Sequence, residues 1–317
     1  MLDITNQLGA IMKAERYFTV DKDGFYGAYF PIDKADHAFI AMLGDDIDDL
    51  LAKTGVKWLQ KRGYNCLTMS PAKADYGHHN YPLERFDKAI AFLKEQGNRK
   101  IGIIGASTTG MLALITASYY PDITMTLAFS PSDFVMEGFY RDGKDGATER
   151  PGDGESTVSL DGKPLPYLPF AYRHPEYWQK IQEESKGSGN FISSVHLFDE
   201  SEKRHPLQEA EKIRVEKIQG HIVFIGAEDD VLWDTCRYIR RMEERLSEKK
   251  HACTYDSLCY RYGTHFIFPE SMLKMMLPIG SKLILGLMFR STKEHPSECK
   301  ETRIDIEKKL QSILQNW

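Results

Sequence analysis

One short segment of the sequence places a serine among small residues, as a nucleophilic serine requires. It covers residues 105–110 (GASTTG) and directly follows an apolar run of strand character. A serine at a tight strand-to-helix turn holds its hydroxyl out at the carboxyl end of a sheet, and the next N–H group points toward a nearby oxyanion. The spacing departs from the usual G-x-S-x-G, because Thr109 takes the fifth position and the second glycine moves to Gly110. The segment predicts Ser107 as a nucleophile and Thr108 as an oxyanion donor, the alternative being a turn without chemistry.

A serine hydroxyl needs a general base, and the base needs a carboxylate that orients it. Two later loops, each after an apolar run, supply these groups: Asp229 and Asp230 lie in the first and His265 in the second. The order serine, acid, histidine is the order of folds that carry the nucleophile at such a turn. We therefore predict a triad of Ser107, Asp230 and His265. Helix capping would also explain the acids, and the spacing leaves open whether Asp229 is the acid or a residue that supports the loop.

A second oxyanion donor is expected from the loop after the apolar run 37–43. Gly44, Asp45 and Asp46 lie there, and the backbone N–H of Asp45 is the natural candidate. Two acids near a developing negative charge are unexpected, so we predict that their side chains point outward or that the site is tuned differently. An acidic helix start, favoured by the helix dipole, is the alternative role for them.

The elements that must position these residues alternate along the chain. Apolar runs without polar alternation predict buried strands, and amphipathic stretches between them predict helices. The strands are expected at 37–43, 64–69, 100–105, 124–130, 220–226 and 252–259, and the helices at 47–59, 82–96, 111–119, 235–248, from 271 and at 301–316. Residues 16–32 contain a turn signal and predict a hairpin at the sheet edge. The pattern predicts an α/β fold with a mostly parallel central sheet and helices on both faces.

Residues 131–206 interrupt this alternation with glycine, acidic and proline-rich stretches. We interpret them as an inserted cap or lid within a single domain that covers residues 1–317. The aromatic side chains of this cap predict an apolar cover for an acyl group, with self-packing as the alternative. They are Phe134, Phe139, Tyr140, Tyr167, Phe170, Tyr172, Tyr177 and Trp178.

Composition excludes several classes of protein. The chain has 317 residues, 42% of them hydrophobic and 27% charged, and a net charge of −5 without a long basic block, so neither disorder nor nucleic-acid binding is expected. The five cysteines have no Cys-x-x-Cys spacing and favour reduced thiols. We find neither a secretory signal at the amino end nor an apolar stretch able to span a bilayer, and so expect a cytoplasmic protein without membrane contact.

Cofactors are not indicated by the sequence. Asp75, His78 and His79 could suggest a metal site, but no strong further ligand follows them at metal-binding spacing. Neither a P-loop nor a dinucleotide-binding glycine motif occurs. We therefore expect no metal and no nucleotide cofactor.

Several of these segments together resemble a known family. They are the Ser107 turn, residues 130–138 (SPSDFVMEG), residues 162–170 (GKPLPYLPF), the loop 226–233 and the turn 263–265. From about residue 35 to 290 the chain resembles the carboxyl-terminal catalytic domain of the acyl-CoA thioesterase and bile acid-CoA:amino acid N-acyltransferase family. The resemblance implies an α/β-hydrolase fold, and it implies that the family's nucleophile, acid and base fall on Ser107, Asp230 and His265.

The family resemblance also implies an activity. Members with a serine nucleophile tend to be hydrolases, whereas the amino acid conjugating branch tends to use cysteine. Ser107 therefore favours thioester hydrolysis, and the expected substrate is a small-molecule acyl compound such as an acyl-CoA. The chain departs from the animal enzymes because only about 35 residues precede its first core strand, too few for their β-rich amino-terminal domain. The alternatives are a carboxylesterase or peptidase of the same fold, an acyl-CoA N-acyltransferase, or a catalytically silent binding protein. The sequence does not give the oligomeric state.

Overall fold

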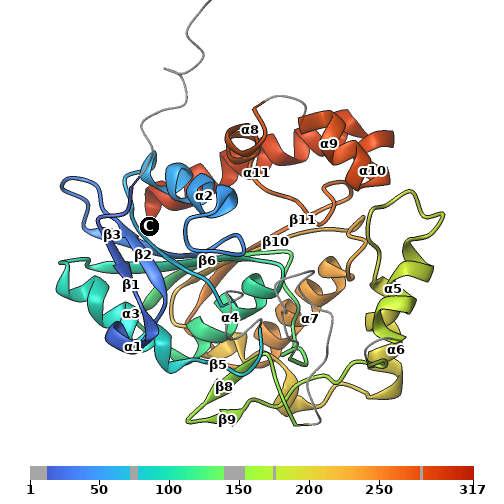
Figure 1. The fold of residues 1–317 in the computed structure, drawn as a ribbon, viewed down its shortest axis with the longest axis horizontal. Helices are drawn as coiled ribbons and strands as arrows, with labels where there is room; N and C mark the ends of the chain where they lie inside the picture. The colour runs from blue at the N-terminus through green and yellow to red at the C-terminus, as the bar shows by residue number, and fades with distance from the viewer. Residues whose placement is uncertain (1–12, 72–77, 139–153, 174–175, 279–280) are drawn as a thin grey trace, which may run out of the picture.

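The computed structural model describes residues 13–71, 78–138, 154–173, 176–278 and 281–317. Within these residues one sheet has eight strands in the order β1-β2-β4-β3-β6-β7-β10-β11 (Figure 1). The strands are β1 (Arg16–Phe18), β2 (Gly27–Phe30), β3 (His37–Met42), β4 (Asn65–Met69), β6 (Lys100–Ala106), β7 (Ile123–Phe129), β10 (His221–Ala227) and β11 (Thr254–Tyr260). The six strands from β4 to β11 in this order are parallel to one another, and β2 pairs antiparallel with β1 and β4. The mostly parallel sheet and the edge hairpin predicted from the sequence are confirmed.

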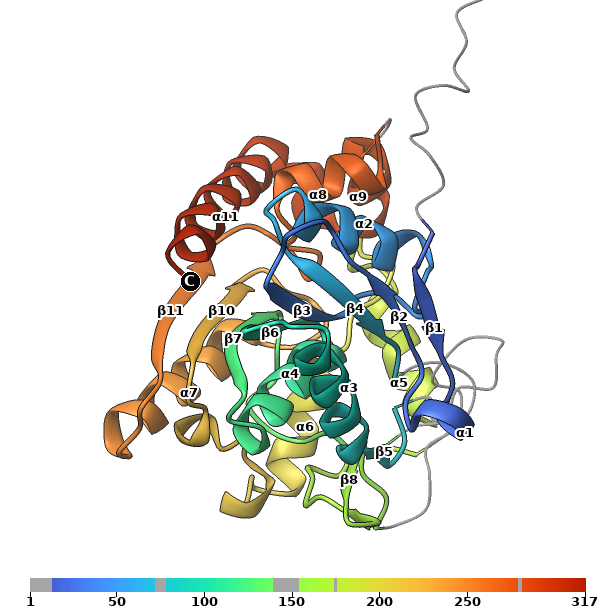
Figure 2. The same cartoon turned by 90° about the vertical axis from the view of Figure 1, so that its left-hand side faces the viewer.

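Helices cover both faces of this sheet (Figure 2). One face carries α2 (Leu50–Gln60), α8 (Glu270–Met276) and α11 (Pro296–Asn316), and the other carries α3 (Glu84–Glu95), α4 (Thr108–Tyr119) and α7 (Thr235–Glu248). The short helices α1 (Val20–Asp23), α9 (Ser281–Met288) and α10 (Arg290–Glu294) complete the helices outside the segment between β7 and β10. In β6 the buried Ile103 packs into one layer and the buried Ile104 into the other. Burial on both faces explains why the strands lack polar alternation in the sequence.

The carboxyl-terminal helices differ from the expectation. The amphipathic stretch from residue 271 forms α8, which ends at Met276 just before Pro278, and the separate helices α9 and α10 follow it. The last helix begins at Pro296, five residues before the predicted start. Proline is well suited to the first turn of a helix, because its missing N–H group would have no partner there. No helix in the described ranges combines the length and apolar character needed to cross a membrane.

The segment between β7 and β10 contains more regular structure than the sequence pattern indicated. It holds β8 (Val158–Leu160), β9 (Lys163–Pro164), α5 (Glu176–Ser185), α6 (Val195–Arg204) and two short 3-10 turns, η2 (Glu209–Glu211) and η3 (Val215–Lys217). Strand β5 (Tyr81–Pro82) pairs with β8, so a small second sheet joins this segment to the chain just before α3. The helices escaped prediction because each buries only two or three side chains.

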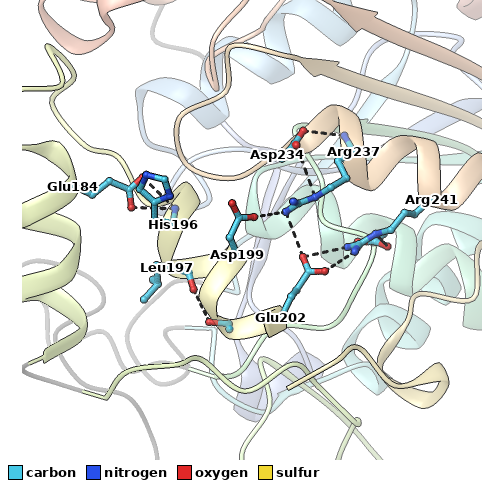
Figure 3. A network of polar contacts seen from close by, with 10 residues as sticks. Glu184, His196, Leu197, Asp199, Glu202, Asp234, Arg237 and Arg241 are labelled. Atoms are coloured by element: carbon cyan, nitrogen blue, oxygen red, sulfur yellow. Dashed lines mark hydrogen bonds and ion pairs between the residues drawn. The ribbon is translucent and has the colours of Figure 1, made fainter. Parts of the chain in front are cut away.

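An ion-pair network joins this segment to the main domain (Figure 3). Arg237 on α7 contacts Asp199 on α6 at 2.6 Å, and Arg241 contacts Glu202 at 2.5 Å. Arg241 also binds the buried Asp133 through two contacts of 2.5 and 2.8 Å. Helix α6 is therefore held against α7 by side chains that are only partly exposed, where charge pairs are screened less than at the surface.

Candidate active site

Ser107 lies at the turn between β6 and α4. Its backbone has φ 60° and ψ −127°, a conformation that residues other than glycine rarely adopt, and its N–H donates to the carbonyl of Phe129 on β7 at 2.8 Å. Such strain persists only where neighbouring contacts impose it and is concentrated at functional sites. The predicted strand-to-helix turn is present, with Ser107 at the carboxyl end of a central strand.

The altered glycine spacing around Ser107 has a structural reason. A Cβ atom at Gly110 would lie 2.6 Å from the Phe129 carbonyl oxygen, so the first turn of α4 can pack on β7 only with glycine at this position. Thr109 fills the position where glycine is usual. Its hydroxyl donates to the Met42 carbonyl at 2.6 Å and accepts the Ala106 N–H at 3.0 Å. The hydroxyl therefore ties the end of β3 to the turn that carries Ser107.

Gly110→Ala is expected to destabilise the protein by about 1–3 kcal/mol, because the added methyl group collides with backbone atoms that cannot rotate away. The control is Gly286→Ala in α9, where the nearest atoms are 3.8 Å from the added Cβ. In a helix this change is expected to be neutral or to stabilise by up to about 1 kcal/mol. Urea unfolding of both variants measures the difference, and equal stabilities would contradict the packing argument.

His265 and Asp230 are in direct contact. The imidazole Nδ1 lies 2.8 Å from Oδ2 and 3.0 Å from Oδ1 of Asp230, and both residues are buried. The carboxylate also accepts the Thr235 hydroxyl at 2.5 Å and the Leu232 N–H at 2.9 Å. The Trp233 ring packs edge-on against the imidazole with 4.8 Å between ring centroids. These contacts hold the ring with Nδ1–H donating to Asp230, which leaves Nε2 as an acceptor.

Ser107 and His265 line the same cavity, which has a volume of about 240 Å³. The Nε2 atom of His265 is buried and has no hydrogen-bond partner among the described residues. A buried nitrogen without a partner is unfavourable unless a ligand or a reacting group uses it. The cavity therefore has both a serine and a histidine with an unpartnered ring nitrogen among its lining residues.

The two neighbouring acids Asp229 and Asp230 have different partners. Only Asp230 contacts the imidazole of His265, whereas Asp229 accepts the N–H groups of Gly263 and Thr264. Of the two acids between which the sequence could not choose, Asp230 is therefore the one beside the imidazole, and Asp229 contacts the backbone of the loop before His265.

The Asp45 amide, which the sequence suggested as a second oxyanion donor, has a side-chain acceptor in the structure. Its N–H donates to Oδ2 of Asp49 at 2.7 Å, and the next amide, of Asp46, donates to the same oxygen at 3.1 Å. Asp49 caps α2 and accepts the Ala52 N–H with its other oxygen. Its carboxylate is therefore the acceptor for three backbone N–H groups at the start of this helix. The Asp45 amide is therefore already used. The Asp46 carboxylate accepts the Tyr26 hydroxyl at 2.8 Å, and burial and this bond raise the pKa of Tyr26.

The cavity wall combines apolar and polar side chains, and none of the predicted cap aromatics that the structure describes is among them. Its lining residues are Met42, Leu43, Gly44, Asp45, Leu51, His78, Ala106, Ser107, Thr108, Thr109, His265, Phe266 and Phe268. Phe266 and Phe268 escaped the sequence interpretation although they flank His265 within three residues. The sequence did not indicate Leu51 on α2 as a cavity residue, since only the fold brings it there.

The described cap aromatics pack mainly on one another. Phe170 contacts Tyr177 and Phe198, and Phe198 contacts Trp233, with ring centroids 5.3–5.8 Å apart. The alternative of self-packing therefore accounts for these rings, which support the Trp233 that lies on His265. Phe139 and Tyr140 lie outside the described residues.

Comparisons with known proteins agree with this architecture. A family model described as BAAT / acyl-CoA thioester hydrolase C terminal matches residues 81–286. The solved structure of MGS-M1, an α/β-hydrolase enzyme from a Medee basin deep-sea metagenome library, has 12% sequence identity, and the match covers 95% of this chain and 98% of that one with a TM-score of 0.51. An esterase of Pyrococcus furiosus, Pf2001, matches at 14% identity over 87% of this chain and 94% of its own, with a TM-score of 0.44. No curated protein sequence gives a significant match.

The similarity to MGS-M1 shows the fold, and the family match covers well over half of the chain. The sheet order and the helices on its two faces are those of an α/β-hydrolase. The chain belongs to the BAAT / acyl-CoA thioester hydrolase C-terminal family.

Proposed function

We propose that this protein is a serine hydrolase that cleaves an acyl thioester or ester through an acyl-enzyme intermediate, with Ser107 as nucleophile, His265 as base and Asp230 as orienting acid. One observation carries the proposal. Asp230 fixes the imidazole of His265 through Nδ1, and the Nε2 atom of this ring has no hydrogen-bond partner among the described residues. His265 and Ser107 line the same cavity. This is the division of roles that a serine triad requires.

The reaction follows from these roles. His265 Nε2 accepts the proton of the Ser107 hydroxyl while the serine oxygen attacks the carbonyl carbon of the substrate. The tetrahedral intermediate collapses, the imidazolium gives its proton to the leaving thiolate or alkoxide, and the acyl group remains on Ser107. Water then attacks the acyl-enzyme, gives a proton to Nε2 and releases the acid, and the proton returns to Ser107.

The oxyanion that forms during both steps needs hydrogen-bond donors. Thr108 is the first residue of α4 and lines the cavity beside Ser107, so its N–H belongs to the helix end that carries partial positive charge. We assign the oxyanion to this amide. Removal of one such donor typically lowers kcat about 100- to 1000-fold.

The cavity and the family together indicate the substrate. A volume of about 240 Å³ with Met42, Leu51, Phe266 and Phe268 in its wall fits a small apolar acyl group. The family match favours a thioester. Water rather than an amino acid is the proposed acceptor because the family's members with a serine nucleophile tend to be hydrolases. Coenzyme A recognition would require cationic side chains near the cavity mouth, and the cap segment offers Arg141, Lys144, Arg173 and Lys180 as candidates. Arg173 pairs with Glu137 and Lys180 with Glu183, and Arg141 and Lys144 lie outside the described residues. The cation pattern therefore adds no argument for acyl-CoA over another thioester.

The proposal includes a cytoplasmic location and a single hydrolase domain whose cap is residues 131–206. All five cysteines are free thiols, as expected for a reducing compartment. The pairing of β5 with β8 supports one domain, because the cap shares a sheet with the segment that precedes α3.

Parallel assays of short- and medium-chain acyl-CoA thioesters, p-nitrophenyl esters and a peptide substrate test the substrate class. We expect the highest kcat/KM for a short-chain thioester. Glycine or taurine added to the assay is expected to leave the product a free acid. Conjugates with these amino acids would support the acyltransferase alternative, and hydrolysis of esters alone would support the carboxylesterase.

Thr235→Val is expected to lower kcat about tenfold with little change in KM, because one hydrogen bond to the ionised Asp230 is worth about 1.5 kcal/mol. Valine keeps the shape of the fully buried Thr235 side chain. The matched control is Thr116→Val, since Thr116 is equally buried but its hydroxyl has no partner among the described residues. Steady-state kinetics of both variants check this, and equal kcat values would show that Thr235 does not support the acid.

A further inference from the structure

Asp229 lies next to the proposed acid, but its carboxylate faces the loop before His265. One oxygen, Oδ1, accepts the Gly263 N–H at 2.9 Å and the Thr264 N–H at 2.7 Å. The other oxygen accepts the hydroxyl of Ser291, in the first turn of α10. A single side chain therefore joins the loop after β10, the histidine loop and a carboxyl-terminal helix.

The segment that Asp229 holds is strained. Thr264 has φ 62°, and a β-branched residue in this left-handed region is a clear outlier. Such a conformation costs on the order of 1–3 kcal/mol and persists only where the surroundings impose it. The two bonds from consecutive N–H groups to Asp229 are contacts of this kind. Without them the turn would relax toward an ordinary conformation.

The strained residue directly precedes His265, so its backbone angles set the direction in which the imidazole leaves the loop. A second contact holds the other side of the histidine, because the Ser130 hydroxyl donates to the His265 carbonyl at 3.1 Å. The imidazole must reach Asp230 with Nδ1 and the cavity with Nε2 at the same time. A small rotation of the Thr264 backbone would break one of these two alignments.

The contacts use Asp229 as a hydrogen-bond acceptor. Burial raises the pKa of this carboxyl, and the bonds from Ser291, Thr264 and Gly263 oppose that effect. Because an amide oxygen can also accept both N–H groups, and an amide NH₂ can donate to the Ser291 oxygen, asparagine should reproduce the arrangement. Alanine cannot, since it has no acceptor.

We propose that Asp229 is a positioning residue that holds Thr264 in its left-handed conformation and so aligns the imidazole of His265 between Asp230 and Ser107. The proposal rests on the proposed function for its effect on the rate, but the alignment itself is a structural property that is measurable without turnover.

Asp229→Ala, Asp229→Asn and Ser291→Ala test this proposal. We expect Asp229→Ala to lower kcat about 100-fold with KM within about threefold, as for a reacting group displaced by about 1 Å. Asp229→Asn should restore kcat to within about fivefold of wild type, because both amide bonds are retained. Ser291→Ala, which removes only the outer bond, should stay within about threefold of wild type.

The downfield proton resonance of His265 Nδ1–H, assigned by its loss in His265→Gln, gives a readout independent of turnover. It should be present in wild type and Asp229→Asn and lost or broadened in Asp229→Ala. Full kcat and an unchanged resonance in Asp229→Ala would overturn the proposal, as would an Asp229→Asn enzyme as slow as Asp229→Ala. If wild type hydrolyses none of the substrates, the proposed function fails, and the resonance still tests the positioning role.

Discussion

Ser107→Ala is expected to abolish hydrolysis, with kcat falling by roughly 10⁵- to 10⁶-fold as for the removal of other triad serines. The serine oxygen forms the covalent bond to the acyl group, and neither the alanine methyl group nor the neighbouring threonines can replace it at the turn. The measurement is the initial rate on the best thioester from the substrate panel. The thermal midpoint should change little, because alanine fits the same backbone turn and removes only one oxygen from a cavity wall.

Ser118→Ala is the matched control for this variant. Ser118 lies on the same helix, α4, and its hydroxyl donates to the Ile115 carbonyl at 2.7 Å rather than lining the cavity. Its removal should leave kcat unchanged. A Ser107→Ala enzyme that keeps more than about 1% of the wild-type rate would exceed the residual activity of known triad mutants and would point to a different nucleophile.

His265→Gln is expected to lower kcat nearly as much as Ser107→Ala, because a neutral amide cannot take the serine proton. Glutamine is preferred to alanine for this test. The side chain of His265 is only 4% exposed and lies against Trp233, so truncation to alanine would also open a cavity and lower the stability. The double variant Ser107→Ala/His265→Gln should be no slower than either single variant, since the members of a triad act as a unit.

His221→Gln is the control for the histidine. His221 lies at the start of β10, at the opposite end of the sheet, and its Nε2 is 2.9 Å from Asp256 Oδ2. It therefore has a carboxylate partner but does not line the cavity of Ser107 and His265, and its replacement should leave kcat unchanged. Equal losses of kcat in His221→Gln and His265→Gln would contradict the role of His265. A Ser107→Ala/His265→Gln variant much slower than both single variants would show that the two residues contribute to the rate independently.

The parts of the site that could be predicted from sequence are those fixed by local spacing. An apolar strand followed by a small-residue turn identified Ser107, and the chain order of acid and histidine after later strands identified Asp230 and His265 as candidates. The choice between Asp229 and Asp230 could not be made, because neighbouring residues in a loop point in different directions and only the packed turn at Thr264 separates their partners.

The hydrogen bond of the Asp45 amide could not be predicted for a related reason. The sequence shows a helix start after β3, but not that Asp49 bends back as its cap and takes the Asp45 amide. The sequence could not decide between an acyl cover and self-packing for the cap aromatics, because aromatic content alone does not say which surface a ring covers. Phe170 and Phe198 pack on each other, while the cavity wall comes from Phe266 and Phe268 beside the histidine.

The sheet was predictable because buried parallel strands leave uninterrupted apolar runs. Helices α5 and α6 were not, since most of their residues are polar and their few buried positions, such as Ile181 and Phe198, make no long periodic pattern. These helices are held by contacts distant in sequence, including the ion pair of Arg237 with Asp199.

The most direct test of the triad is to find where an acyl-mimicking probe binds covalently. A fluorophosphonate reacts with a serine only when a nearby base activates it, so native protein should gain one probe mass, located by peptide mapping on Ser107. Heat-unfolded protein and Ser107→Ala should gain none. A single adduct on any other residue, or full hydrolytic activity in protein that never forms an adduct, would contradict the account.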